Sequence, residues 1–170
     1  MPDQTRWLDD DEQRAWRAYL RGTRMLEEAL DRDLQDHGLA LSEYEIISML
    51  SESPLHRLRM SELAELVVQS RSRLTHTATR LERRGWVVRQ PCENDRRGVE
   101  LVLTPEGAQR VLDVAVAHVS SVRRHLLDLV SAQQFATLGE AMARVVEAQP
   151  DTDRCPESVA VAASDRPENA

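Results

Sequence analysis

The sequence predicts a mainly α-helical fold: a winged helix-turn-helix with a small β-hairpin wing, flanked by long N- and C-terminal dimerisation helices. Two short helical patterns joined by the tight turn Val68–Gln69 are typical of a helix-turn-helix. The apolar period then changes from helical spacing to alternation, which predicts a β-hairpin. Apolar stripes on either side of this unit are longer than a compact chain of 170 residues can bury by itself.

The first helix is predicted from about Asp10 to His37. Asp9, with Glu12 three residues later, is a helix start signal, and Gly38 stands where a helix end favours glycine. One helical stripe carries Trp16, Tyr19, Leu20, Thr23, Leu26, Leu30 and Leu34. A helix of this length spans about 42 Å, well beyond the common length of helices in globular proteins.

The helix-turn-helix follows a second helix, which is predicted to begin at Ser42, where Glu45 completes a capping box, and to stop before Pro54. The helix pair itself is predicted at Ser61–Val67 and Ser70–Arg84, and a glycine ends its second member.

The wing is predicted from a strand at Trp86–Arg89 and a return strand at Val99–Leu103, joined by a long charged loop over Pro91–Gly98. A threonine-proline pair then occupies the preferred first positions of a helix that is predicted to continue to about Val130.

A last helix is predicted to begin at Ser131, with Gln134 as its capping partner. Beyond this helix the composition shifts to Pro, Asp, Glu, Ser and Ala, which is typical of a disordered segment. The expected organisation is a flexible N-terminus at 1–9, a helical dimerisation region at 10–37 and 105–149, a winged helix-turn-helix domain at 38–104 and a disordered acidic tail at 150–170. Because a single copy would leave much of its apolar stripes in water, we expect an obligate two-fold dimer.

Positive charge is concentrated in the predicted winged helix. Residues 56–97 hold ten arginines and five acids, a local charge of +5, whereas the remainder holds twelve arginines and twenty-four acids, a local charge of −12. Because phosphates respond to the local field, an acidic protein with one basic segment fits a nucleic-acid binder. On charge alone, a solvated charged face explains the asymmetry equally well.

Composition also limits the class of protein. The longest apolar run, Val159–Ala163, is five residues, against the about 20 that a membrane helix needs, and the polar, acidic N-terminus predicts no signal peptide. Cys92 and Cys155 provide neither a disulfide framework nor a zinc cage, so we expect a cytoplasmic protein. The sequence carries no glycine-rich phosphate loop and no nucleophile elbow, so we expect no enzyme activity.

Five segments stand in a fixed order between about Asp10 and Gln149. They are Leu58-Arg-Met-Ser-Glu-Leu-Ala, Ser70-Arg-Ser-Arg-Leu-Thr, Leu81-Glu-Arg-Arg-Gly-Trp-Val, Asn94-Asp-Arg-Arg-Gly and Leu103-Thr-Pro-Glu-Gly. In this order and spacing the sequence resembles the MarR (multiple antibiotic resistance regulator) family. The resemblance implies a bacterial, dimeric, DNA-binding transcription regulator, often a repressor that is relieved by a small ligand or an oxidant.

We expect the helix at 70–84 to lie in the major groove of double-stranded DNA. Leu74, Ala78 and Leu81 form its core face, which leaves the opposite face for DNA. Arginine can bond guanine bidentately, a threonine methyl can contact thymine, and a helix N-terminus can meet a phosphate. The candidate base contacts are Arg71, Arg73, Thr75 and His76, and the candidate phosphate contacts are Ser70 and Arg80.

Arg96 and Arg97, at the tip of the hairpin, are the candidate minor-groove residues, because the negative potential of a narrow groove attracts a guanidinium. Asp95 cannot favour DNA by its own charge, so we expect it to orient an arginine through an ion pair. The resemblance carries the family's Asp-x-Arg wing motif over to Asp95 and Arg97. Two copies related by a two-fold axis are expected to bind an inverted repeat with half-sites about 34–36 Å apart.

A small aromatic effector is implied by the resemblance alone, since the family's effector pocket lies between the dimerisation helices and the winged helix. Trp16, Tyr19 and Tyr44 are the candidate lining residues, although each also fits core packing at helical spacing. Cys92 lies near arginines, which favour a thiolate, and near acids, which oppose it, so a redox role and a packing role both stay open. The histidines show no ligand spacing, so we expect no metal and no cofactor.

One alternative function stays open, a winged helix that serves only as a dimerisation or protein-interaction module without specific DNA binding. Arginines on both the groove helix and the wing favour DNA, because an interaction module has no need of them at both places.

Overall fold

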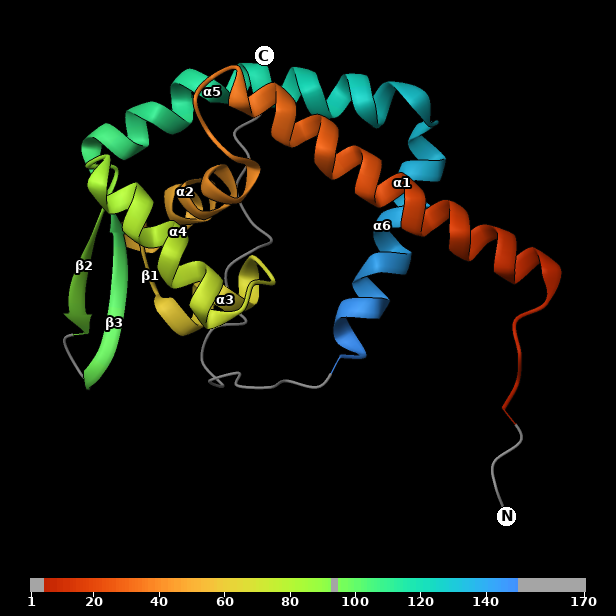
Figure 1. Cartoon of the computed structure of the whole chain (residues 1–170), viewed down its shortest axis with the longest axis horizontal. Helices are drawn as coiled ribbons and strands as arrows, with labels where there is room; N and C mark the ends of the chain where they lie inside the picture. The colour runs from red at the N-terminus through yellow and green to blue at the C-terminus, as the bar shows by residue number, and fades with distance from the viewer. Residues whose placement is uncertain (1–4, 93–94, 150–170) are drawn as a thin grey trace.

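The computed structural model describes residues 5–92 and 95–149, with only the backbone described for Arg96 and Arg97. In chain order its elements are α1 (Asp10–Gln35), α2 (Leu41–Glu52), η1 (Pro54–His56), β1 (Arg57–Arg59), α3 (Met60–Leu66), α4 (Arg71–Arg83), β2 (Val87–Cys92), β3 (Asp95–Leu103), α5 (Pro105–His125), η2 (Leu127–Leu129) and α6 (Ala132–Glu147). The short helices and the strands gather at one end, while α1 and α5 pack side by side and α6 turns away from them (Figure 1). The predicted tail at 150–170 and the first four residues of the predicted flexible N-terminus lie outside the described residues.

The start of α1 is confirmed as a capping box. The Glu12 amide donates to the Asp9 carboxylate at 2.8 Å, and the Asp9 amide donates to the Glu12 carboxylate at 3.0 Å. The helix ends at Gln35, and Gly38 adopts φ 71°, a left-handed conformation that reverses the chain at low steric cost.

The predicted capping box of the second helix is wrong. Helix α2 begins at Leu41, and the residue that bonds back to the amide of Ala40 is Glu43, at 3.1 Å, rather than Glu45. The cap forms two residues earlier than predicted because Glu43 lies on the buried side of α2 with Ile46, Ile47 and Leu50, where its carboxylate needs partners.

The helix-turn-helix consists of α3 and α4, which lie close to the predicted ranges. Ser70 is the N-cap of α4, since its hydroxyl accepts the Arg73 amide at 3.3 Å. In the turn between the helices Val68 adopts φ 48°, an uncommon conformation for a β-branched residue, and its side chain is 91% exposed.

The sheet contains one strand more than predicted, because β1 pairs with β3 and gives the order β1-β3-β2. The predicted long loop over Pro91–Gly98 is wrong, since β2 continues to Cys92 and β3 begins at Asp95, with an irregularity between Pro91 and Cys92. Two features allow this pairing. Pro91 stands opposite Val99 on the edge strand, where a proline is tolerated although it lacks an N–H donor. Gly98 leaves room for the Cys92 sulfur, because a Cβ on it would lie only 2.6 Å from that atom.

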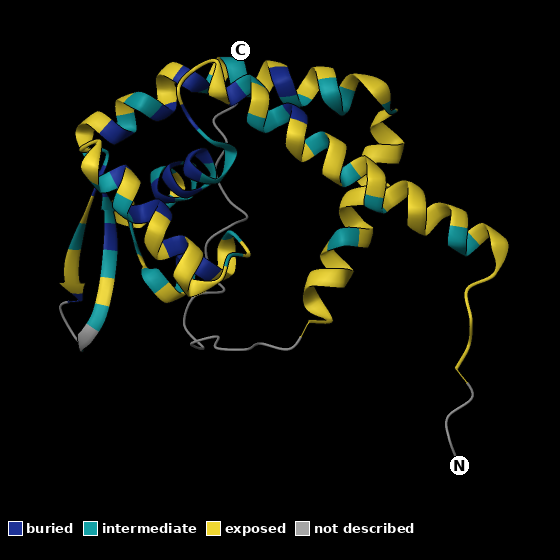
Figure 2. Cartoon of the chain, viewed as in Figure 1, coloured by how far each residue is buried: buried dark blue, intermediate teal, exposed yellow. Residues whose placement is uncertain are grey.

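The C-terminal helices are shorter than predicted. Helix α5 ends at His125, and the single turn η2 precedes α6, which is capped by Ser131 and Gln134 as expected. The core is centred on α2, and none of the described residues of α6 is buried (Figure 2). Apolar side chains of α1, α5 and α6 stay exposed, among them Trp16, Met25, Val116, Val119, Phe135 and Val145. Across residues 5–92 and 95–149, no helix combines the length and apolar character that crossing a bilayer requires.

Candidate nucleic-acid interface

Helix α4 has a buried face and an exposed polar face. Its buried residues include Leu74, Ala78 and Leu81, as the sequence predicts, and the polar face lies on the surface of the molecule (Figure 2). All of the predicted contact residues on this helix and its cap are exposed: Ser70, Arg71, Arg73, Thr75, His76 and Arg80. The geometry therefore presents three side-chain types that can contact base edges on one surface.

Hydroxyl groups on this face are bonded within the helix. The Thr75 hydroxyl donates to the Arg71 carbonyl at 2.8 Å, and the Thr79 hydroxyl donates to the Thr75 carbonyl at 2.9 Å. With its hydroxyl engaged in this way, Thr75 has its methyl group to offer a base.

Arg80, predicted as a phosphate contact, is paired within the protein. Its Nε donates to the Glu43 carboxylate at 3.0 Å, although 51% of its side chain remains exposed. Glu43 is only 3% exposed and is not among the residues predicted from the sequence. A signal was available, because Glu43 shares the helical spacing of the buried residues Ile46, Ile47 and Leu50.

The C-terminal end of α4 is tied to the connection between α1 and α2. Arg84 donates to the Gly38 carbonyl at 2.8 Å and lies 3.5 Å from the Glu43 carboxylate. The guanidinium groups of Arg84 and Arg110 lie 4.9 and 5.5 Å from the centre of the Trp86 ring. This cluster fixes α4 against α2, α5 and the residue that precedes β2.

We define the wing as the β2–β3 hairpin, and it is joined to α4 by Arg89. Its guanidinium forms an ion pair with Glu82 and donates to the Thr75 carbonyl at 3.0 Å and the Thr79 hydroxyl at 3.1 Å. Asp95 forms an ion pair with Arg59 of β1 at 3.4 Å, so one partner of this carboxylate belongs to a strand that the sequence did not predict.

The three predicted effector residues form two separate contacts. Trp16 and Tyr19 stack on α1 with ring centroids 5.9 Å apart, and the Tyr19 hydroxyl lies 3.6 Å from the sulfur of Met142 on α6. Tyr44 is buried on α2, where its ring packs 4.4 Å from that of His118 on α5. The prediction that these aromatics line one pocket therefore finds no support in their positions.

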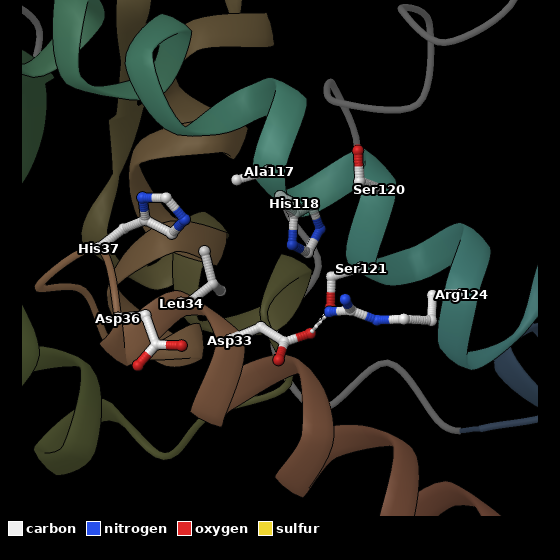
Figure 3. Close-up of a pocket in the computed structure, with 9 residues that line it drawn as sticks. All are labelled: Asp33, Leu34, Asp36, His37, Ala117, His118, Ser120, Ser121 and Arg124. Carbon is white, nitrogen blue, oxygen red and sulfur yellow. Dashed lines mark hydrogen bonds and ion pairs between the residues drawn. The ribbon is translucent and has the colours of Figure 1, made fainter.

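A cavity of about 230 Å³ lies between the end of α1 and the C-terminal half of α5 (Figure 3). Its lining includes Asp33, Leu34, His37, His118, Ser121 and Arg124, and none of the three predicted aromatics. Burial lowers the pKa of His118, and its Nδ1 atom has no hydrogen-bond partner among the described residues.

Asp33 forms the charged side of this cavity. It accepts hydrogen bonds from the Ser121 hydroxyl and, at 2.6 Å, from Arg124, and it lies 3.0 Å from His125 Nε2. The Ser121 hydrogen bond, followed by those of Arg124 and His125, lowers the pKa of Asp33 from its ordinary 3.8 to about 2. The cavity thus combines an ionised carboxylate, a guanidinium and an unpaired imidazole nitrogen.

Cys92 is buried on the wing, where burial raises the pKa of its thiol. The nearby carboxylates of Glu100 and Asp95 act in the same direction, and Arg59 opposes them. This environment favours the thiol over the reactive thiolate, which suits the packing role. Within the described part of the chain, no group of three or more potential ligand side chains is arranged around a metal position.

Known proteins of one family share this architecture. A family model described as the MarR family matches residues 39–99. AbsC, a MarR family transcriptional regulator from Streptomyces coelicolor, is 47% identical over 84% of this chain and 97% of its own, with a TM-score of 0.78. Sco3205, a MarR family regulator from the same organism solved in complex with DNA, is 43% identical over 88% of this chain and 94% of its own, with a TM-score of 0.83.

More distant relatives extend the comparison. The HTH-type transcriptional regulator PecS from Dickeya dadantii is 30% identical over 71% of this chain and 73% of its own length. NadR in complex with 4-hydroxyphenylacetate is 23% identical, covers 88% of this chain and all of its own, and has a TM-score of 0.65. At that identity the likeness shows the fold alone, a fold whose solved structures include complexes with small molecules.

Proposed function

The chain belongs to the MarR family of transcriptional regulators, and on that premise we propose that it is a homodimeric, ligand-responsive repressor. It binds an inverted-repeat operator with α4 in the major groove and the wing in the minor groove. The observation that carries this proposal is the exposed face of α4, where Arg71, Arg73 and His76 stand together on a helix whose other face is buried. The 43% identity with Sco3205, which is solved in complex with DNA, supports it. Because a regulator that binds operator DNA acts where that DNA is, we place it in the cytoplasm.

The dimer is supported by the apolar side chains that α1, α5 and α6 leave exposed. Val116 is 77% exposed and Met25 57% exposed, and neither belongs to the winged helix. Burying such surface yields about 25 cal/mol per Å², so a second copy is the natural cover for it. A two-fold dimer places two α4 helices on one side of a DNA duplex.

Titration of labelled promoter DNA tests the proposal, with fluorescence anisotropy as the readout. The probe is a duplex from upstream of the protein's own coding sequence that contains an inverted repeat, and the competitor is a scrambled duplex. We expect the probe to bind at least about 10³-fold more tightly than the competitor at physiological salt. Arg73→Ala and Arg97→Ala should each weaken binding, whereas Arg123→Ala, on α5 and far from the wing in sequence, should not.

The alternative of a protein-interaction module predicts a different result. Such a module would bind both duplexes equally weakly, and Arg73→Ala would leave that binding unchanged apart from a small electrostatic loss. Equal affinity for probe and competitor would therefore refute the proposed function.

We further propose that the α1–α5 cavity is the effector site and that it takes a small aromatic acid. One terminal nitrogen of Arg124 is bonded to Asp33, and the remaining N–H donors of its guanidinium would bind the carboxylate of the ligand. The unpaired His118 nitrogen would bond a polar substituent, and the His118 ring supplies aromatic surface. A thermal-shift panel of aromatic acids tests this site. A ligand at 100 times its Kd adds about 2.7 kcal/mol, which corresponds to about 5–10 °C in Tm. His118→Ala should abolish the shift, and Trp16→Ala should retain it; the opposite pattern would return the site to the aromatic pair of α1.

A further inference from the structure

We propose that Glu43 is a positioning residue for DNA binding: its buried carboxylate orients the guanidinium of Arg80 for a DNA phosphate. The inference rests on the proposed function, because it assigns a role to a residue that supports the operator-binding face of α4. The sequence predicts a phosphate contact for Arg80 and indicates no role for Glu43.

The geometry of the pair leaves Arg80 available to DNA. Glu43 accepts the Nε hydrogen of Arg80 at 3.0 Å, and one terminal nitrogen lies 3.5 Å from the Thr77 hydroxyl. A guanidinium has five N–H donors, so most of them remain for a second anion. About half of the Arg80 side chain, 51%, is exposed, which gives a phosphate access to those donors.

The carboxylate itself is held from three directions. One oxygen accepts the Ala40 amide at 3.1 Å at the beginning of α2, and the same oxygen lies 3.5 Å from Arg84. With 3% exposure, Glu43 has little freedom to change rotamer. Because this carboxylate is fixed, it already limits the conformations of the half-exposed Arg80 side chain. Less conformational entropy is therefore lost when Arg80 binds a phosphate.

The cap of α2 does not by itself require a carboxylate at position 43, because the amide oxygen of a glutamine would accept the same Ala40 N–H. The neighbouring buried positions of α2 are Ile46, Ile47 and Leu50, and an apolar residue at position 43 would pack with them without the desolvation cost of a buried charge. A carboxylate also fixes the orientation of the Arg80 guanidinium, because it accepts hydrogen bonds from a defined edge of that group.

A double-mutant cycle on operator affinity tests the inference, with affinities measured across a salt series. Arg80→Ala should lower affinity by about tenfold, the effect of losing one charged hydrogen-bond contact, and should reduce the salt slope by about one. Glu43→Gln should weaken binding in the same direction, and the double variant should bind no more weakly than Arg80→Ala alone. Glu52→Gln, the same substitution at an exposed position of α2, is the matched control and should bind like the wild type.

Arg80→Lys keeps the test decisive if Glu43→Gln fails to fold. Lysine retains the charge but lacks the second edge that lets arginine bond a carboxylate and a phosphate together, so Arg80→Lys should lose nearly as much affinity as Arg80→Ala. Losses that add in the double variant, or an Arg80→Lys protein that binds like the wild type, would overturn the inference. If the wild type does not distinguish operator from scrambled DNA, the proposed function fails instead.

Discussion

Gly107 lies where α5 approaches the base of the wing, and substituting alanine there should destabilise the protein. A Cβ at this position would lie 2.1 Å from the Trp86 carbonyl oxygen and 2.8 Å from the Leu103 Cδ1 atom. The same Trp86 carbonyl accepts the Thr104 amide at 3.0 Å, a hydrogen bond that joins the start of α5 to the first residues of the hairpin. Because the main obstacle is backbone, a rotamer change cannot relieve the clash.

The expected loss of unfolding free energy in Gly107→Ala is about 3 kcal/mol. Overpacking costs about 1–3 kcal/mol, and a clash between backbone and Cβ belongs at the upper end of that range. Weakening the hydrogen bond from the Thr104 amide to the Trp86 carbonyl increases the loss of unfolding free energy by about 1 kcal/mol. The better helix propensity of alanine reduces that loss by about the same amount. For a chain of this size the loss corresponds to a fall in Tm of about 6–12 °C.

Urea unfolding followed by circular dichroism, at one fixed protein concentration, measures this loss. Gly22→Ala on α1 and Gly139→Ala on α6 are matched controls, because an added Cβ at either position meets no atom within 4 Å. Both controls should gain about 0.5–1 kcal/mol from helix propensity, so the sign of the effect separates them from Gly107→Ala. A Gly107→Ala protein as stable as the wild type would show that α5 does not approach the Trp86 carbonyl this closely.

Three further predictions concern single residues. Val68→Gly should raise the urea midpoint, with a gain in unfolding free energy of about 0.5–1 kcal/mol, because glycine adopts φ 48° without the backbone strain of valine. The Val68 side chain is 91% exposed, so its removal costs few contacts. An unchanged or lower midpoint would show that Val68 is not strained. Asp33 has its pKa lowered to about 2, so it stabilises the fold above its ordinary pKa of 3.8, and this contribution is lost as the pH falls from about 4 to about 2. Unfolding of Asp33→Asn and wild type should therefore differ most near neutral pH and converge in acid, and a constant difference would refute the assignment. In a Cys155→Ser background, iodoacetamide should label Cys92 slowly in the folded protein and rapidly in denaturant, as mass spectrometry would show, whereas rapid labelling of the folded protein would restore the redox role.

Most of the helix starts follow from local determinants, although the equally local Ser42–Glu45 box did not form. The capping boxes at Asp9–Glu12 and Ser131–Gln134 and the Thr104 cap form as expected, because each depends on residues three positions apart. The buried face of α4 follows equally from its apolar spacing. Local chemistry and periodicity were therefore sufficient for the winged helix-turn-helix order.

Features that depend on distant residues were not predicted. Strand β1 has three residues and exists because Leu58 pairs with Leu101, which no local pattern indicates. The pairing of Glu43 with Arg80 joins positions 37 residues apart, and the α1–α5 cavity brings Asp33 to Ser121, 88 residues away. In each case the partner is selected by the packed fold, so its identity becomes visible only in three dimensions.

The two proposed sites share a short piece of backbone, the connection that follows α1. His37 lines the cavity, and its carbonyl accepts Arg110, while the next carbonyl, that of Gly38, accepts Arg84 at the end of α4. A ligand can change operator affinity only if it binds two arrangements of the protein unequally, and this connection is where a displacement at the cavity would reach the recognition helix. Such coupling is reciprocal. Operator DNA must therefore lower the affinity for the ligand by the same factor by which the ligand lowers the affinity for the operator. The contacts of Arg84 with the Gly38 carbonyl and the Glu43 carboxylate join this connection directly to the end of α4.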